Sequence, residues 1–412
     1  MDVAEYAERA WRGEVDLATM RPELLSPGFA AFDHGLGFAC AFSNVLALDS
    51  DEGLVLLDTS SPFHAGAVHA LLRRWSRRPV HTAVFTHGHV DHVLGVVPFD
   101  DEAREAGRSI TVVAHRAVRD RFARYRLTHG YNARINQRQF RLPSPMFPAS
   151  FREPDVTVED RVNLVVGGRE VCLSHDRGET DDHLWAWIPA ARALYTGDLF
   201  IWASPNCGNP QKAQRYPREW AAALRKMDAL GAEVLFPGHG PPIVGADRVR
   251  QALTETATLL ESLVEQTLRA MNEGATLDDV LHAVRAPAAL LERPYLRPVY
   301  DDPQFIVRNL WRLYGGWWDG NPARLKPPRD AELAAALCDA AGGAAIMAER
   351  ALAALRQGRA ELAGSLAQFA IDAAPRDPRV RAIYREVNEE RAREETSLMA
   401  QSIFRAAARR GP

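Results

Sequence analysis

The seven residues from Thr86 to His92 are the stretch of this chain best suited to chemistry. They read Thr-His-Gly-His-Val-Asp-His, so four of the seven are side chains that bind metal ions. A strand-like run, Val80 to Phe85, precedes them, and an apolar run, Val93 to Val97, follows them. This order predicts a tight loop between a strand and a helix, where imidazoles and a carboxylate can converge. Imidazole suits zinc, copper, iron or nickel, and the added carboxylate indicates a hydrolytic metal centre.

Three further candidate ligands follow along the chain. Glu179 lies in Gly-Glu-Thr-Asp-Asp-His, Asp198 in Leu-Tyr-Thr-Gly-Asp, and His239 in Phe-Pro-Gly-His-Gly. Each follows an apolar, strand-like run and has a glycine beside it, which allows the backbone to approach a metal closely. One metal ion needs at least three protein ligands and a pair of ions needs about six. The loop and these three residues together are enough for two ions.

The His-x-His-x-Asp-His loop and the order of the later residues resemble the metallo-β-lactamase superfamily. This resemblance implies a four-layered αββα sandwich that binds two zinc ions. One ion would bind His87, His89 and Glu179. The other would bind Asp91, His92 and His239, and Asp198 would bridge both. The resemblance also implies a metal-held hydroxide as nucleophile, with Asp91 or Asp198 accepting a proton during turnover.

Two more residues are implied to support the ligands without binding metal. Asp58 ends the strand-like run 54–57 and resembles the aspartate that supports the histidine loop in the superfamily. His183 aligns with a supporting histidine. Glu179 stands where most members carry a histidine, and a carboxylate there resembles the alkylsulfatase branch. The alternative is that Glu179 is a turn or helix-cap acid and that His183 is the ligand.

An aromatic block lies in the second half of the chain, at 295–300, 305–314 and 315–323. Its sequence Gly-Trp-Trp-Asp-Gly-Asn-Pro-Ala, from Gly316 to Ala323, resembles the dimerisation region of alkylsulfatases and implies a homodimer. From the residues alone, such a block suits packing between domains, a pocket wall or a dimer contact.

Length and pattern divide the chain into three predicted parts, because 412 residues exceed one ordinary domain. Residues 1–27 are predicted to form an N-terminal helical arm, with a helix over 1–20. Residues 28–245 alternate strands and helices, which suits the αββα sandwich. Residues 246–412 are predicted to be an all-α dimerisation domain, rich in Ala, Leu, Glu and Arg at helical spacing, with a tetratricopeptide-like end.

Two polar segments, predicted to be loops, are candidates for holding a small anionic ester substrate. The predicted substrate-binding residues are Tyr131, Asn132, Asn136 and Arg138 in the first segment, and Lys212 and Arg215, with Asn209, Gln211 and Tyr216, in the second. Guanidinium groups suit sulfate and phosphate oxygens. The arginine that holds sulfate in alkylsulfatases has no direct counterpart, because Thr196-Gly197-Asp198 has the form of the wider superfamily. Alkylsulfatases usually carry a C-terminal sterol-carrier-like domain, which we do not expect in this protein.

The composition of the chain argues against some classes of protein. The net charge of −3 provides no general basic field for nucleic acid. No apolar leader and no 18-residue apolar run occur, and the four cysteines form no pair motif, so we predict a cytoplasmic protein without a membrane span. The sequence predicts a dinuclear zinc hydrolase of alkyl sulfate esters. The alternatives are a hydrolase of another ester, lactone, thioester or phosphoester, and a non-catalytic binding protein.

Overall fold

The computed structural model describes residues 1–17, 23 and 26–409, which form two compact units. The first, here called the sheet unit, contains residues 1–132, 147–275 and 279–315. The second, the helical unit, contains residues 133–146, 276–278 and 316–412.

Two β-sheets form the centre of the sheet unit. The first sheet has strand order β1-β2-β3-β4-β5-β6-β7 and the second has order β13-β12-β11-β10-β9-β8. The first comprises β1 (Gly28–Phe32), β2 (Leu36–Cys40), β3 (Val45–Ser50), β4 (Gly53–Leu57), β5 (Val80–Phe85), β6 (Thr111–His115) and β7 (Val156–Val158). The second comprises β8 (Arg161–Val166), β9 (Arg169–His175), β10 (Leu184–Ile188), β11 (Ala193–Ile201), β12 (Val234–His239) and β13 (Ile243–Val244).

The pairing of the strands brings the chemically interesting strand ends together. Strands β4, β5, β6 and β7 are parallel, and so are β11 and β12. The carboxyl ends of parallel strands meet at one edge of a sheet, so the residues that follow β4 and β5 are neighbours. The two sheets pack face to face through aromatic side chains, with the rings of Phe38 and Phe236 5.1 Å apart.

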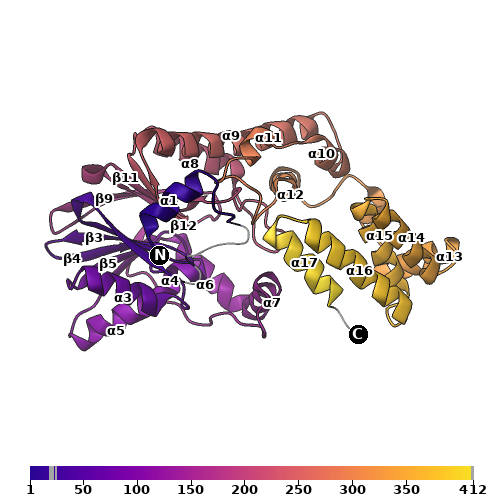
Figure 1. Ribbon diagram of the computed structural model, residues 1–412, viewed down its shortest axis with the longest axis horizontal. Coiled ribbons are helices and arrows are strands. Elements are labelled where there is room, and N and C mark those ends of the chain that lie inside the picture. The colour runs from indigo at the N-terminus through magenta and orange to yellow at the C-terminus, as the bar shows by residue number, and fades with distance from the viewer. Residues whose placement is uncertain (18–22, 24–25, 410–412) are drawn as a thin grey trace. The chain divides into compact units, whose positions relative to one another are not determined.

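Helices cover the outer face of each sheet, so the sheet unit has the four layers that the sequence predicts (Figure 1). Helices α3 (Ala65–Trp75) and α5 (Val97–Glu105) cover the first sheet. There Val68, Leu72 and Phe99 join a core with the alternate residues Leu54 and Leu56 of β4. Helices α8 (Pro217–Asp228) and α9 (Ala246–Asn272) cover the second sheet.

The remaining elements of the sheet unit are short helices and 3-10 turns. They are η1 (Asp33–Gly35), α4 (Val90–Val93), η2 (Leu94–Val96), α6 (Ala117–Leu127), η3 (Pro189–Ala191), α11 (Ala288–Leu291) and α12 (Pro303–Gly315). Helix α10 (Leu277–Ala283) begins in the helical unit and ends in the sheet unit.

The predicted N-terminal helix is shorter than expected and belongs to the sheet unit. Helix α1 (Val3–Trp11) begins where the Asp2 carboxylate caps the backbone N–H groups of Ala4 and Glu5. Its Trp11 ring stacks on Tyr295 at 5.3 Å and lies under the guanidinium of Arg248. Residues 18–22 and 24–25 of the predicted arm lie outside the described residues.

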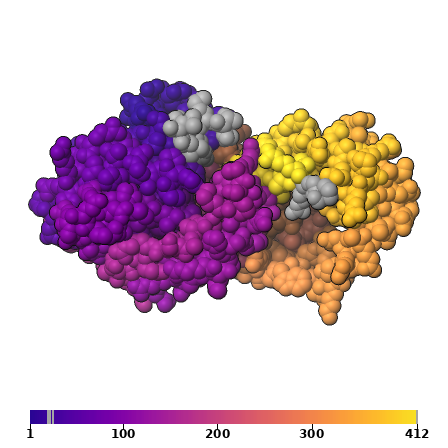
Figure 2. Space-filling view, turned by 90° about the horizontal axis from the view of Figure 1, so that it is seen from below, coloured from indigo at the N-terminus to yellow at the C-terminus, as the bar shows by residue number. Residues whose placement is uncertain are grey.

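The helical unit is built from α13 (Asp330–Ala340), α14 (Ala344–Arg356), α15 (Ala360–Ala373), α16 (Pro378–Glu394) and α17 (Leu398–Ala408), with the 3-10 turn η4 (Pro322–Arg324) before them. Residues 330–408 form an orange-to-yellow surface in Figure 2. The core of the helical unit consists mostly of small side chains such as Ala351 and Ala367. Small residues let helices approach closely, so the alanine-rich pattern at helical spacing is enough to build this core.

Helix α7 (His129–Phe140) replaces the first predicted loop, so that prediction was wrong. Few apolar residues mark this segment, but Ala133 and Ile135 are buried. The Ser402 hydroxyl also donates to the Gln139 carbonyl at 2.9 Å. Tertiary packing, rather than local sequence, therefore explains this helix.

The compact units divide elsewhere than at the predicted boundary between 245 and 246. Helix α9 lies in the sheet unit because Leu253, Leu260 and Leu263 are fully buried on one face of it. The change to all-helical composition therefore marks a change of secondary structure and not the edge of a packed unit.

Among the described residues, no single helix is long and apolar enough to cross a bilayer, although the bent pair α13 and α14 meets that test jointly. The four cysteines form no disulfide.

Candidate metal centre

The histidine loop runs from the end of β5 to the start of α4, as the sequence predicts. Its backbone is held from the opposite side by Asp182, whose carboxylate accepts from the Gly88 N–H at 3.1 Å. The Arg121 guanidinium donates to the same Asp182 oxygen at 2.6 Å. A Cβ atom at Gly88 would lie 2.7 Å from Arg121 Cδ, so glycine leaves room for this contact. These contacts fix the direction in which His87 and His89 project.

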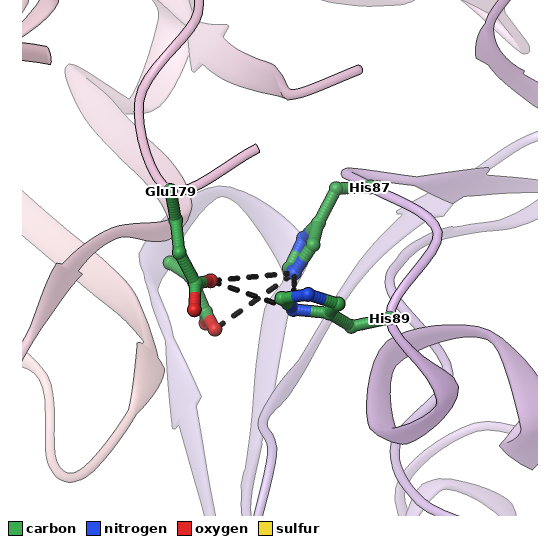
Figure 3. Close-up of side chains that lie close together, drawn as sticks. His87, His89 and Glu179 are labelled. Carbon is green, nitrogen blue, oxygen red and sulfur yellow. Dashed lines mark hydrogen bonds and ion pairs between the residues drawn. The ribbon is translucent and has the colours of Figure 1, made fainter. Parts of the chain in front are cut away.

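A first group of potential ligands consists of His87, His89, Glu179 and Asp198, whose ligand atoms all lie within 4.8 Å of one another. Glu179 Oε2 lies 3.7 Å from His87 Nε2 and 3.5 Å from His89 Nδ1 (Figure 3). Asp198 Oδ2 lies 3.8 Å from His87 Nε2. The histidine loop, the loop between β9 and β10 that carries Glu179, and strand β11 that carries Asp198 therefore present their ligand atoms to one small volume.

A second group consists of Asp91, His92 and His239, also within 4.8 Å. Asp91 Oδ2 lies 3.7 Å from His92 Nε2 and 3.5 Å from His239 Nε2. The other oxygen of Asp198, Oδ1, lies 3.2 Å from His92 Nε2 and 3.4 Å from His239 Nε2. Asp198 thus offers one oxygen to each group, which is the geometry of a bridging carboxylate.

The residues of both groups fit divalent metal ions. His92 Nε2, Glu179 Oε2 and Asp198 Oδ1 are buried without a hydrogen-bond partner. Buried polar atoms rarely stay unsatisfied, and here they point at one another from imidazoles and carboxylates, the donors that zinc and similar ions prefer. Two cations would satisfy these atoms and offset the negative charge of the three carboxylates.

The charges of the imidazoles differ between the groups. Burial and the neighbouring His92 imidazole lower the pKa of His87 well below its usual value, so this ring is neutral. Burial also lowers the pKa of His92, but the carboxylates of Asp198 and Asp58 outweigh it and hold that pKa well above its usual value. The pKa of His239 is raised too, because Asp198 outweighs burial. A metal bound at the second group would replace these protons.

Asp58 supports the loop as the sequence suggests. Its carboxylate accepts from the Thr86 N–H at 2.7 Å and the Thr86 hydroxyl at 2.8 Å. It also contacts His92 Nδ1 at 2.8 Å and accepts from the Tyr195 hydroxyl at 3.0 Å. A carboxylate on Nδ1 leaves Nε2 to face Asp198, which orients the imidazole as a ligand.

Of the two alternatives for the seventh ligand, the structure places Glu179 in the first group and His183 beside it. His183 Nε2 accepts from the Asp198 backbone N–H at 3.1 Å, and its ring stacks on His87 with centroids 4.7 Å apart. The glycines next to the ligands are needed for close approach: a Cβ at Gly238 would lie 2.2 Å from Asp198 Oδ1.

The first set of predicted substrate residues is divided between the two units, with Tyr131 and Asn132 in the sheet unit. The Tyr131 side chain is 64% exposed. The Asn132 amide donates to the hydroxyl of Thr128, one turn earlier, at 2.7 Å. Asn136 and Arg138 belong to the helical unit.

The second set lies on the loop between β11 and α8. Arg215 is buried there, and its guanidinium contacts Glu179 instead of an open pocket. Lys212 is half-buried, and it makes no hydrogen bond or ion pair through its ammonium group to the described residues. Asn209 is buried with its oxygen accepting from the Gln211 N–H, and Tyr216 lies under the guanidinium of Arg177. Only Lys212 of this set keeps an uncommitted charge.

Sequence reasoning missed Asn206, which contacts a candidate ligand, and residues that hold the segments around the ligands. Asn206 donates to Glu179, and Arg121 holds Asp182. Tyr300 and Asp301 lie in the segment before α12. The Asp301 carboxylate accepts from the Gly208 N–H at 2.5 Å. The only signal for Asn206 was its place a few residues beyond Asp198, and nothing in the pattern marked Arg121.

Comparison with known proteins agrees with this geometry. Residues 39–239 match the metallo-beta-lactamase superfamily, and residues 276–411 match the alkyl sulfatase dimerisation family. A linear primary-alkylsulfatase of Pseudomonas sp. is 28% identical over 319 residues, covering 72% of this chain and 60% of the relative. An (R)-specific secondary-alkylsulfatase of Pseudomonas sp. is 26% identical over 375 residues, covering 84% and 57%.

A solved structure shows the same fold along nearly the whole chain. The stereoselective inverting sec-alkylsulfatase Pisa1 from Pseudomonas sp. has a TM-score of 0.84 at 24% identity, covering 94% of this chain and 66% of that one. This chain spans less than two thirds of the length of either curated relative. The resemblance and the fold predicted from the sequence are thus confirmed: the chain contains a metallo-beta-lactamase domain followed by an alkylsulfatase dimerisation domain.

Proposed function

We propose that this protein is a metal-dependent hydrolase of alkyl sulfate esters. The observation that carries the proposal is the pair of ligand groups that share Asp198, in a chain that matches the metallo-beta-lactamase superfamily and the alkyl sulfatase dimerisation family. We assign two zinc ions to the site, one at His87, His89 and Glu179 and one at Asp91, His92 and His239, with Asp198 between them. Such ions lower the pKa of water and polarise ester oxygens when bound.

The charge of the site suits an anionic substrate. Two divalent cations would exceed the charge of the three carboxylates by one, and the side chains of Lys212 and Arg215 add two further positive charges. Arg215 is engaged with Glu179, so Lys212 is the residue we assign to the sulfate group. Burial and the nearby Arg215 lower the pKa of Lys212 to about 8, so it remains charged at neutral pH.

We assign proton transfer to the ligand Asp91 and to Tyr300. Asp91 is partly exposed, which leaves its carboxylate able to accept a proton from water at the site. Burial raises the pKa of Tyr300, and the carboxylates of Glu179 and Asp91 raise it further, so its hydroxyl keeps its proton and acts as a donor.

We also propose a homodimer, formed through residues 276–411. Large apolar side chains stay exposed in this region, among them Trp317 at 70% and Leu325 at 50%. An aromatic residue left open to solvent in a region that matches a dimerisation family is the kind of side chain that anchors an interface.

The substrate class can be tested by rate comparison with zinc-loaded protein. Alkyl sulfates with chains of C4 to C12 would be compared with alkyl phosphates, acyl esters and lactones of matched chain length. We expect kcat/KM to be highest for a sulfate. A phosphate, ester or lactone preferred over every sulfate would favour the alternative hydrolase classes and leave the metal ligands in place.

A further inference from the structure

We propose that Arg215 and Asn206 are positioning residues for Glu179. Both hold one carboxylate oxygen so that only the other can bind a metal ion, and Arg215 also offsets the negative charge of Glu179. The inference deepens the proposed function and rests on its metal centre. It assigns to Arg215 a role other than substrate binding.

The side chains of Arg215 and Asn206 form a buried clamp around one oxygen of Glu179. Arg215 Nη1 lies 3.1 Å from Glu179 Oε1 and donates to the Glu179 backbone carbonyl at 2.5 Å. The Asn206 amide nitrogen donates to the same Oε1. Glu179, Arg215 and Asn206 are all buried. Both bonds from the side chains therefore act on Oε1 alone.

The other oxygen is left for the metal. Glu179 Oε2 is buried with no hydrogen-bond partner, and it lies on the side of His87 and His89 (Figure 3). A carboxylate with both oxygens free could bind a metal through either one or both. With Oε1 fixed, only Oε2 is available, which makes Glu179 geometrically similar to an imidazole with one free nitrogen.

The charges of Glu179 and Arg215 also support a positioning role for Arg215. A carboxylate brings one negative charge that a neutral imidazole would not, and a negative ligand weakens the pull of a metal on its substrate. The guanidinium of Arg215 adds one positive charge within ion-pair distance of Glu179. Their sum is zero, so the clamp offsets the charge that the glutamate introduces. A buried carboxylate without this partner would be strongly disfavoured.

The clamp is held by a second segment of the sheet unit. The Ser204 N–H donates to the Arg297 carbonyl at 2.9 Å, and the Asn309 side chain donates to the Arg215 carbonyl at 3.0 Å. Between them, the Gly208 N–H donates to Asp301. Residues 297–309 therefore fix both ends of the loop that carries Asn206 and Arg215.

Metal affinity tests the clamp without reference to turnover. We would measure zinc affinity by chelator competition, and the visible spectrum of the cobalt-loaded protein, for Arg215→Met, Arg215→Lys and the full-length wild-type chain. Arg218→Met is the matched control, because Arg218 is exposed on α8 and loses the same charge. We expect Arg215→Met to weaken one of two metal equivalents at least tenfold and to change the cobalt bands. Arg215→Lys should recover part of that loss, and Arg218→Met should match wild type.

A double-mutant cycle separates charge compensation from a purely structural role. If Arg215 acts by compensating Glu179, then Arg215→Met should cost less metal affinity in a Glu179→His background, where no charge needs offsetting. Equal losses in both backgrounds would overturn the proposal. So would a folded Arg215→Met protein that binds two equivalents with wild-type affinity and cobalt spectrum.

If Arg215→Met does not fold, Asn206→Ser is the substitute variant. It shortens the side chain that donates to Glu179 and leaves all charges unchanged. We expect a several-fold weaker metal affinity and a shifted cobalt spectrum, and unchanged values would overturn the proposal equally. Thermal denaturation of the metal-free proteins identifies variants that are merely unstable. Intact metal binding without sulfate ester hydrolysis would reject the proposed function alone.

Discussion

At the scale of residues, the candidate ligands can be proposed from the sequence because their signal is local. Four of them lie within one loop, and the other three each follow an apolar run beside a glycine. The supporting contacts escape prediction because they join distant positions. Arg121 holds an aspartate 61 residues away, and Arg215 contacts Glu179 across 36 residues. A polar segment shows that charge is present, but not whether a guanidinium faces solvent or a buried carboxylate.

The first prediction at the scale of residues concerns the pH dependence of catalysis and the side chain of Lys212. Burial and Arg215 lower its pKa to about 8, so the fraction of charged ammonium falls as the pH rises through that value. If the ammonium binds the sulfate group, kcat/KM for an alkyl sulfate should decline above about pH 8. Lys212→Met should lose roughly 10- to 100-fold in kcat/KM at pH 7, the value of a hydrogen bond to a charged group.

The pH profile of Lys212→Arg is the control for this prediction. Arginine stays charged over the whole range, so the decline above pH 8 should move beyond it. A Lys212→Met protein with the kcat/KM and pH profile of wild type would remove Lys212 from the substrate site.

At the scale of elements, strands and helices with clear periodicity are recovered from the sequence, whereas α7 is not. Strands β4 and β5 lie close to their predicted positions because each is a short apolar run. Helix α7 has a polar, glycine-containing sequence that resembles a loop, and its packing becomes visible only in the folded chain. The loop between β11 and α8 is a similar case, because residues 297–309 determine its shape.

Gly208 tests the importance of that loop. A Cβ added there would lie 2.2 Å from the backbone nitrogen of Ile306, so Gly208→Ala must displace one of the two segments. We expect Tm to fall by roughly 3–10 °C, the range for overpacking by about 1–3 kcal/mol in a domain of this size. Zinc affinity should fall as well, because Asn206 lies two residues away.

Gly66→Ala is the matched control for Gly208→Ala. Gly66 lies in the first turn of α3, and a Cβ there would meet nothing within 4 Å. Alanine favours a helix over glycine, so Tm should stay the same or rise slightly. Equal Tm and zinc affinity for the two alanine variants would contradict the role given to the loop.

At the scale of the whole molecule, the fold class follows from pattern and resemblance together. Alternating strands and helices indicate a layered α/β unit, and the loop motif selects which one. The boundary between compact units could not be derived, because composition reports secondary structure and not which helices bury their apolar faces together. A cytoplasmic location stays a prediction from the sequence.

The dimer is the prediction that belongs to this scale. Trp317→Glu places a charge on the most exposed tryptophan of the dimerisation region, so it should raise the dimer dissociation constant by at least about 30-fold. Leu127→Glu is the control, because Leu127 is 86% exposed in the sheet unit. Light scattering at micromolar concentration measures both variants. A monomeric wild-type chain, or a Trp317→Glu dimer as tight as wild type, would contradict the proposed interface.

The most direct test of the account is inorganic sulfate release from an alkyl sulfate while zinc is titrated into metal-free protein. We expect the rate of release to rise until about two equivalents of zinc per chain have been added, and to be lost in His89→Ala. Release that needs no metal, or that continues at the wild-type rate in His89→Ala, would contradict it. Two bound zinc ions without release from any alkyl sulfate would reject the sulfate ester as substrate.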